Sequence, residues 1–214
     1  MPSPPTWTEP LRRHLSLLLP LAVCSAQLAA QAPLDTLPRR LVVVHNGLQP
    51  GIGRLCRVQV GKDFSYIGGQ RFILQSIADA EQHFFVKSDS THTIEELYWI
   101  QAERMLPGQT GGYTYADDST RTWNGLPWKV DLRLNRGGPR AGSDGAAMRD
   151  YLARLGYRFP ALAPRLRLVY LPTSGGPSEL MIVYLAALST ALPDTTLPGI
   201  FRRATGSLEP TGCP

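Results

Sequence analysis

The chain has 214 residues, 43% of them hydrophobic, and a formal net charge of +5. This length predicts one domain with a sizeable core rather than two domains. The arginines and lysines are dispersed among carboxylates and apolar runs, as on an ordinary solvated surface. We therefore expect no nucleic-acid partner.

The first 32 residues have the three parts of a secretory signal peptide. Arg12, Arg13 and His14 precede an apolar run at 15–23, and small residues follow at 24–32. A basic stretch, an apolar stretch and a small-residue cleavage region in this order are typical of export signals. The sequence predicts a signal peptide at 1–32 and a secreted or periplasmic protein whose mature chain begins between Gln27 and Pro33.

The apolar run at 15–23 also bears on membrane attachment. It is far shorter than the roughly 20 residues that cross a bilayer, and no later apolar run reaches that length, so no membrane span is expected. Cys24 offers an alternative, acylation as in a lipoprotein. The residue before such a cysteine is normally very small, and the β-branched Val23 disfavours this alternative.

Two cysteines remain once Cys24 is assigned to the leader. Export places Cys56 and Cys213 in a compartment that permits disulfides, and we predict a bridge between them. Such a bridge requires Cα atoms within about 7 Å, and two free thiols are the alternative. The chain has no CxxC, no HExxH and no zinc-ribbon spacing, so we expect neither a metal site nor a cofactor.

Composition divides the exported part into three segments. Prolines and glycines at 33–62 predict an irregular N-terminal arm with at most one short strand. Strand-like patterns from residue 63 predict a single α+β domain at 63–190. Proline, threonine and glycine in the last residues predict a flexible C-terminal tail at 191–214.

Alternation of polar and apolar residues predicts antiparallel hairpins. Residues 77–87 alternate, and residues 94–105 alternate again after a polar loop. Asn124 and Gly125 form the strongest two-residue turn signal in the chain, and the alternating strand 128–134 follows them. Residues 77–87 and 94–105 are expected to pair as neighbouring strands, and residues 128–134 are expected to pair with the strand before the turn.

The later part of the chain adds a helix and another hairpin. Ser143 or Asp144 is placed to cap a helix in which apolar residues recur at helical spacing as far as Leu155. Residues 165–171 and 179–188 are two β-rich runs around a proline and glycine turn. The sum predicts an α+β fold, a mainly antiparallel sheet of six or seven strands with one late helix packed on a face.

Asp79, Glu81 and His83 form the one compact group of acids and imidazole in the sequence. On a regular strand these three side chains share one face. The simplest interpretation is a polar outer face of the sheet. A ligand-facing patch, or a general acid/base or metal site in which the carboxylates orient the imidazole, are the alternatives.

The register of the hairpin decides which residues surround this group. If odd positions face odd positions, the neighbours are Trp99, Gln101 and Glu103, which form a polar face with an aromatic wall. If odd positions face even positions, the neighbours are Tyr98, Ile100 and Ala102. The sequence leaves both registers open.

These features favour a non-enzymatic domain that binds a small lipophilic ligand in or beside its sheet. The candidate ligand-binding residues are Tyr98, Trp99, Gln101 and Trp128. The first alternative is an enzyme that uses Asp79, Glu81, His83 and Glu103. The second is a protein-interaction module that uses a sheet edge. A small lipophilic molecule or a protein is therefore the expected partner.

Overall fold

The computed structural model describes residues 37–213 except 117, 137, 161 and 189–195. The predicted signal peptide at 1–32, including Cys24, lies outside the described residues. All described residues belong to one unit of the chain, residues 32–214.

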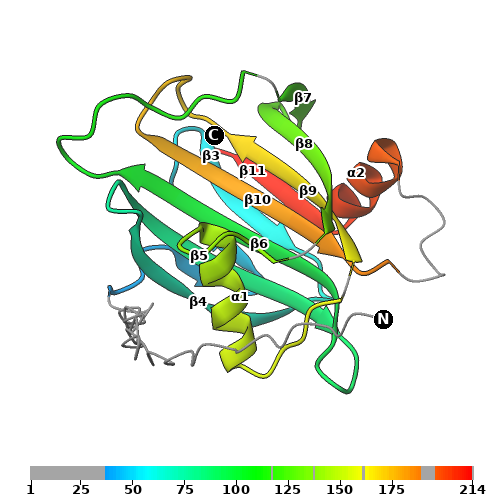
Figure 1. The fold of residues 1–214 in the computed structure, drawn as a ribbon. Helices are drawn as coiled ribbons and strands as arrows, with labels where there is room; N and C mark the ends of the chain where they lie inside the picture. The colour runs from blue at the N-terminus through cyan, green and yellow to red at the C-terminus, as the bar shows by residue number, and fades with distance from the viewer. Residues whose placement is uncertain (1–36, 117, 137, 161, 189–195, 214) are drawn as a thin grey trace, which may run out of the picture. The chain divides into compact units, whose positions relative to one another are not determined.

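A seven-stranded antiparallel sheet forms the body of this unit (Figure 1). Its strands are β4 (Ser65–Leu74), β5 (Ala78–Ser88), β6 (Ile94–Met105), β7 (Ser119–Trp123), β8 (Leu126–Arg136), β9 (Leu162–Tyr170) and β10 (Ser178–Ala186). The spatial order is β4-β5-β6-β10-β9-β8-β7, and every neighbouring pair is antiparallel. The predicted α+β class with a seven-stranded antiparallel sheet is confirmed.

The turn chemistry predicted from sequence is present where the chain must reverse or bend. Asn124 and Gly125 have φ values of 49° and 73°, as the tight turn between β7 and β8 requires. Gly68 has a φ of 116° at the point where the register of β4 against β5 shifts. The strand therefore has a bulge between Tyr66 and Gly68.

A second, four-stranded sheet corrects two predictions. Its strands are β1 (Val42–Val44), β2 (Gly47–Gln49), β3 (Leu55–Val60) and β11 (Leu208–Gly212), in the order β1-β2-β3-β11. The irregular arm predicted at 33–62 thus contains three strands. The flexible tail predicted at 191–214 ends in a strand, which pairs with β3 and is joined to it by a disulfide between Cys56 and Cys213.

The described residues form two helices, rather than the one predicted. α1 (Asp144–Arg154) is the expected helix, and the Ser143 hydroxyl caps it by accepting from the Ala146 amide at 3.2 Å. α2 (Leu197–Gly206) falls within the predicted tail. A proline in its first turn favours a helix start, although the surrounding composition resembles that of a loop.

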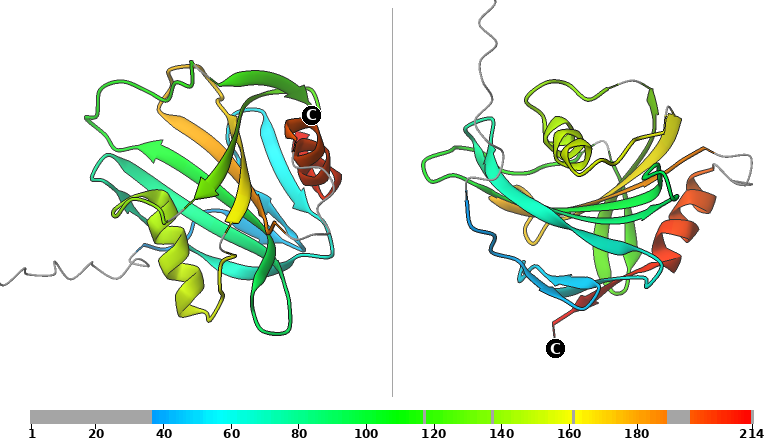
Figure 2. Two further views of the ribbon diagram at one scale, coloured as in Figure 1. Left: turned by 45° about the vertical axis from the view of Figure 1, so that its right-hand side comes forward. Right: turned by 90° about the horizontal axis from the view of Figure 1, so that it is seen from below.

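The two faces of the large sheet have different coverings (Figure 2). One face packs against the small sheet and α2, and we call it the sandwich face. Its residues include Tyr98, Trp128 and Ile182. The other, which we call the helix face, packs against α1 and includes Phe84 and Val183. Because both faces are covered, alternation along these strands does not separate a buried face from a wet one.

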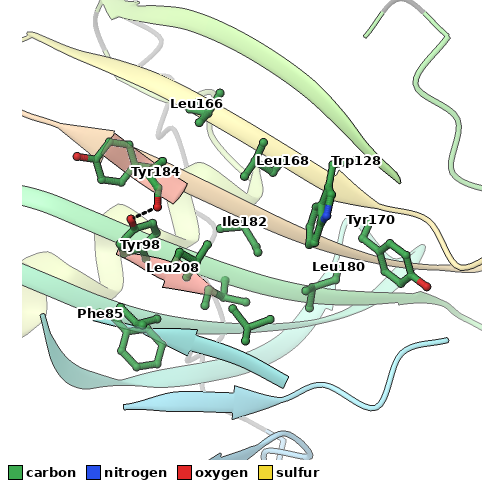
Figure 3. Packing of buried hydrophobic residues seen from close by; sticks show 14 of the residues in the cluster. Phe85, Tyr98, Trp128, Leu166, Leu168, Tyr170, Leu180, Ile182, Tyr184 and Leu208 are labelled. Atoms are coloured by element: carbon green, nitrogen blue, oxygen red, sulfur yellow. Dashed lines mark hydrogen bonds between the residues drawn. The ribbon is translucent and has the colours of Figure 1, made fainter. Parts of the chain in front are cut away.

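The sandwich face holds the larger core, part of which is drawn in Figure 3. Tyr98 and Trp128 are fully buried there. The Tyr98 hydroxyl donates to the carbonyl of Ala204 at 2.6 Å, which ties α2 to the sheet. The Trp128 ring packs between Trp123 and Tyr170, with centroid distances of 5.6 Å and 5.7 Å. Both residues act as core residues in this structure.

Candidate functional site

The register of β5 against β6 separates the residues of the candidate acid and imidazole site. Glu81 lies opposite Ala102 and His83 lies opposite Ile100, so odd positions face even ones. Asp79, Glu81 and His83 therefore lie on the sandwich face, whereas Glu103 lies on the helix face. The structure does not bring the four predicted residues together.

In the cluster at Asp79, Glu81 and His83, Asp79 is half-buried and the other two side chains are buried, which corrects the expectation of a wet outer face. Glu81 and His83 have no exposed surface. The Glu81 carboxylate accepts from the backbone amides of Arg40 and Leu41 at 2.8 Å and 2.9 Å, and His83 Nε2 lies 2.9 Å from Glu81 Oε1. The cluster fastens the segment before β1 to the edge of the large sheet.

Neighbouring side chains complete this fastening. Arg71 donates two hydrogen bonds to Asp79, at 2.9 Å and 2.7 Å, and a third to the carbonyl of Pro38 at 2.6 Å. His83 Nδ1 lies 2.9 Å from the hydroxyl of Tyr66. The polar atoms of the cluster are thus largely occupied by structural partners.

The same contacts lower the pKa values of Asp79 and Glu81. Hydrogen bonds from Arg71 lower the pKa of Asp79. Burial on its own raises the pKa of Glu81, but the hydrogen bonds from His83 and from the amides of Arg40 and Leu41 outweigh burial, so the pKa lies below its ordinary value. Both side chains are therefore held as carboxylates, as their structural contacts require.

A chain of amide hydrogen bonds crosses the helix face. Gln70 Nε2 donates to Gln82 Oε1 at 2.7 Å, and Gln82 Nε2 donates to Gln101 Oε1 at 2.6 Å. Gln101 Nε2 then donates to Glu103. The Trp99 indole N–H donates to Gln101 Oε1 at 2.9 Å, and because an indole only donates, it fixes the direction of the whole chain. Each amide in the chain therefore donates to the next residue toward Glu103, and Gln70 and Gln82 also donate to the carbonyls of Ala147 and Asp144.

Glu103 and Glu179 form a buried pair at the end of this chain. They lie directly opposite each other on β6 and β10, with exposed fractions of 7% and 2%. The hydroxyl of Tyr113 donates to Glu103 at 3.0 Å, and that of Tyr115 donates to Glu179 at 2.7 Å. Both tyrosines lie on the loop before β7, and backbone hydrogen bonds between Tyr113 and the turn at 175–176 hold this loop in place.

Burial makes both carboxyl groups weaker acids than an exposed glutamate. Burial raises the pKa of Glu103. Burial, followed by the charge of Glu103, raises the pKa of Glu179 to about 8. Two carboxylates in one apolar setting repel each other, so at neutral pH the pair retains a proton.

Arginines of β8 and β9 form a cationic group farther along the helix face. Asp131 pairs with Arg133 at 2.9 Å, with Arg165 at 3.1 Å and with Arg167 at 3.7 Å. Arg167 also pairs with Asp118 at 2.8 Å. Two carboxylates, Asp118 and Asp131, therefore serve three guanidinium groups, and positive charge is in excess.

Arg165 shows this excess most clearly. Its Nε is buried and has no hydrogen-bond partner among the described residues. Burial lowers the pKa of Arg165, and repulsion from Arg167 and Arg133 adds to the effect against the attraction of Asp131. A half-buried guanidinium with an unused N–H is a favourable partner for an anion.

A pocket of about 300 Å³ lies between α1 and the helix face. This volume is at the small end of the range for ligand sites, roughly 300–1,000 Å³. Its apolar wall is formed by Trp99, Met148, Val183 and Leu185. Residues of α1, β6 and β10, which are distant in sequence, therefore form this apolar wall together.

The charged part of the pocket wall consists of arginines. Arg133, Arg149 and Arg165 line it, and among the described residues that line the pocket there is no carboxylate. The guanidinium of Arg149 lies over the ring of Phe159, 4.9 Å from its centroid, which holds the charge beside the pocket. The pocket therefore combines an apolar wall with three cationic groups.

The predicted ligand-binding residues divide between the two faces. Trp99 lines the pocket, and Gln101 accepts a hydrogen bond from its indole. Tyr98 and Trp128 lie in the core of the sandwich face. Sequence reasoning missed Glu179, Tyr113 and Tyr115, which no local pattern joins, and treated Arg133 and Arg165 as ordinary surface charge.

Comparisons of the chain with protein-family models, curated proteins and solved structures find no match. Within the described part of the chain, no group of three or more His, Cys, Asp or Glu side chains is placed to hold a metal ion. No helix formed by the described residues has the length and apolar character needed to cross a bilayer.

Proposed function

We propose that this protein binds a small organic anion with an apolar body in the pocket between α1 and the helix face. The observation that carries the proposal is the excess of guanidinium charge around an apolar wall. Arg165 is partly buried with an unused N–H, and the only carboxylate paired with it in the described structure is shared with two other arginines. An anionic group of a ligand supplies the missing charge.

The apolar wall determines the rest of the ligand. Trp99, Met148, Val183 and Leu185 offer an indole face, a thioether and branched side chains. An aromatic or short aliphatic body removes apolar surface from water against this wall. The expected ligand is thus a carboxylate, sulfonate or phosphate attached to an apolar group. It is more polar than the lipophilic ligand that the sequence predicts.

A pair of fluorescent probes tests this proposal. Anilinonaphthalene sulfonate has an aromatic body and a sulfonate, and N-phenylnaphthylamine is the same body without the charge. We expect the folded protein to bind the anionic probe at least about tenfold more tightly, the effect of one charge-assisted hydrogen bond. Equal affinity for the two probes, or no binding of the anionic one, would overturn the proposal.

Substitutions of arginines locate the binding site. Arg133→Gln and Arg149→Gln each remove a cation from the pocket wall, and each is expected to weaken binding of the anionic probe by roughly tenfold. Arg154→Gln is the matched control, because Arg154 lies on α1 as Arg149 does but is not a lining residue. Circular dichroism of each variant checks that the fold is retained.

Export remains part of the proposal. The leader pattern predicts it, and the disulfide between Cys56 and Cys213 supports it, because disulfides persist in oxidising compartments. The enzymatic alternative has less support. The carboxylate of Glu81 and the ring of His83 are occupied by structural contacts, and Glu103 lies on the other face.

A further inference from the structure

We infer that binding of an anion in this pocket is coupled to uptake of a proton by the Glu103–Glu179 pair. The inference rests on the proposed function and assigns a regulation to the same site. It is built on two structural connections that join the carboxyl pair to the pocket wall.

The first connection runs through Trp99. Its ring forms part of the pocket wall, and its indole N–H donates to Gln101 Oε1. The amide of Gln101 donates in turn to Glu103. A single side chain, Gln101, therefore separates the wall of the pocket from the carboxyl pair, and the charge on Glu103 acts on the amide whose oxygen accepts from Trp99.

The second connection runs through Arg167. Its guanidinium lies over the ring of Tyr115, 4.9 Å from the centroid, and Tyr115 is the hydrogen-bond donor to Glu179. Arg167 pairs with Asp118 at 2.8 Å and also reaches Asp131 at 3.7 Å, the carboxylate that Arg165 uses. When Glu179 is ionised it attracts Arg167, which leaves Asp131 free to neutralise Arg165 and weakens the hold of Arg165 on an anion.

The charged and titratable groups around Glu179 come from four other parts of the fold. They are Glu103 on β6, Tyr113 and Tyr115 on the loop before β7, Arg167 on β9 and Asp144 at the start of α1. Burial also raises the pKa of Asp144, so the acids on this face resist ionisation together. An anion placed nearby makes ionisation of the pair still less favourable.

The sign of the coupling follows from these charges. Burial and the charge of Glu103 raise the pKa of Glu179 to about 8, so the pair holds its proton below that pH and loses it above. Loss of the proton adds a negative charge on the same face as the bound anion. Affinity for the anion is therefore high at about pH 6 and falls toward about pH 9, and by linkage the bound anion raises the pKa of the pair.

The experiment measures the dissociation constant of anilinonaphthalene sulfonate from about pH 6 to about pH 9. The sulfonate does not titrate in this range, so a pH dependence belongs to the protein. We expect the wild type to bind at least about fivefold more weakly at the upper pH. Glu179→Gln, which keeps an acceptor for Tyr115 but carries no charge, is expected to bind with nearly constant affinity across the range.

Glu95→Gln is the matched control, because Glu95 is an exposed glutamate on β6, the strand that carries Glu103. It is expected to keep the pH dependence of the wild type. A second measurement uses only the wild type: binding of the probe in weakly buffered solution at about pH 8 should take up protons. This readout remains decisive if Glu179→Gln fails to fold.

The outcomes separate the two proposals. Tight binding of the probe at every pH, without proton uptake, overturns the coupling and leaves the proposed function intact. An unchanged pH dependence in Glu179→Gln overturns the assignment to the Glu103–Glu179 pair. Absence of probe binding at any pH overturns both proposals.

Discussion

Glu103 and Glu179 lie directly opposite each other on β6 and β10, and each accepts a hydrogen bond from a tyrosine of the same loop. Two nearly buried carboxyls on adjacent strands disfavour the simultaneous ionisation of both. This relationship makes the stability of the fold, as well as its affinity for an anion, depend on pH.

Stability is expected to fall as pH rises through the range in which Glu179 titrates. Burial raises the folded-state pKa of Glu179 from 4.5 to about 8, so the folded state keeps a proton that the unfolded state has released. The stabilisation is complete below about pH 4.5 and is lost as pH rises to about 8, on the order of 5 kcal/mol in total. Glu179→Gln should largely remove this loss, as measured by urea unfolding at about pH 5 and pH 9.

Glu95→Gln controls for the removal of a carboxyl and should unfold with the wild-type pH dependence. A wild-type protein that is equally stable at both ends of this range would contradict the prediction.

Glu81→Gln is expected to lower the free energy of unfolding by about 2–4 kcal/mol at neutral pH. The backbone amides of Arg40 and Leu41 each donate to one oxygen of the Glu81 carboxylate. Glutamine replaces one of these oxygens with an N–H donor, so one amide loses its acceptor. Trypsin should also cleave after Arg40 faster than in the wild type, because the segment loses its attachment. A change below about 0.5 kcal/mol, with unaltered proteolysis, would contradict this account.

The contribution of Glu81 to stability also has a predicted pH dependence. Burial opposes ionisation, but the hydrogen bonds from His83 and from two backbone amides leave the folded-state pKa below its ordinary value. Its stabilisation is therefore present above the unfolded-state value, about 4.5, and is lost as pH falls through the folded-state pKa. Wild type and Glu81→Gln should differ less in acid than at neutral pH, as measured by urea unfolding at both.

His83→Ala is expected to cost about 2–3 kcal/mol of stability, whereas a histidine on a wet face would cost no more than about 0.5 kcal/mol. His83 is fully buried, and its two ring nitrogens lie within hydrogen-bond distance of Glu81 and Tyr66. Probe binding should be unchanged, since His83 lies on the face opposite the pocket. A loss of probe affinity in a normally folded variant would show that the two faces are coupled.

Removal of the disulfide should destabilise the unit by about 2–5 kcal/mol. The bond joins Cys56 to Cys213 across 157 residues and holds β11 beside β3. Cys56→Ser combined with Cys213→Ser should unfold at lower urea concentration than the oxidised wild type. Two reactive thiols in denatured, unreduced wild type would show that the bond does not form.

Local sequence patterns predicted the strands of the large sheet and one helix. Asn124 and Gly125 determine a tight turn because both adopt positive φ. The strand that follows pairs with the strand directly before the turn, so this hairpin depends on residues close in sequence. Ser143 determines the start of α1 because its hydroxyl satisfies an amide within the same turn. These features depend on residues close in sequence.

The candidate site could be predicted only in part, because alternation shows that two faces of a strand differ but does not show what covers each face. Asp79, Glu81 and His83 alternate with apolar residues as a wet face would, yet the segment at 38–41 covers them. Trp99 and Gln101 are ligand-binding candidates from the sequence, and the structure places both on the helix face. Their partners Glu179 and Arg165 come from strands far along the chain.

The sequence by itself determined the α+β class and the hairpins of the large sheet, because turn chemistry and strand periodicity act over a few residues. Tertiary structure alone decided the register around His83, the position of Glu179 opposite Glu103, and the folding of the predicted tail into α2 and β11. These depend on pairing between strands that are far apart in the chain and on burial of both faces of the large sheet, which no local pattern records.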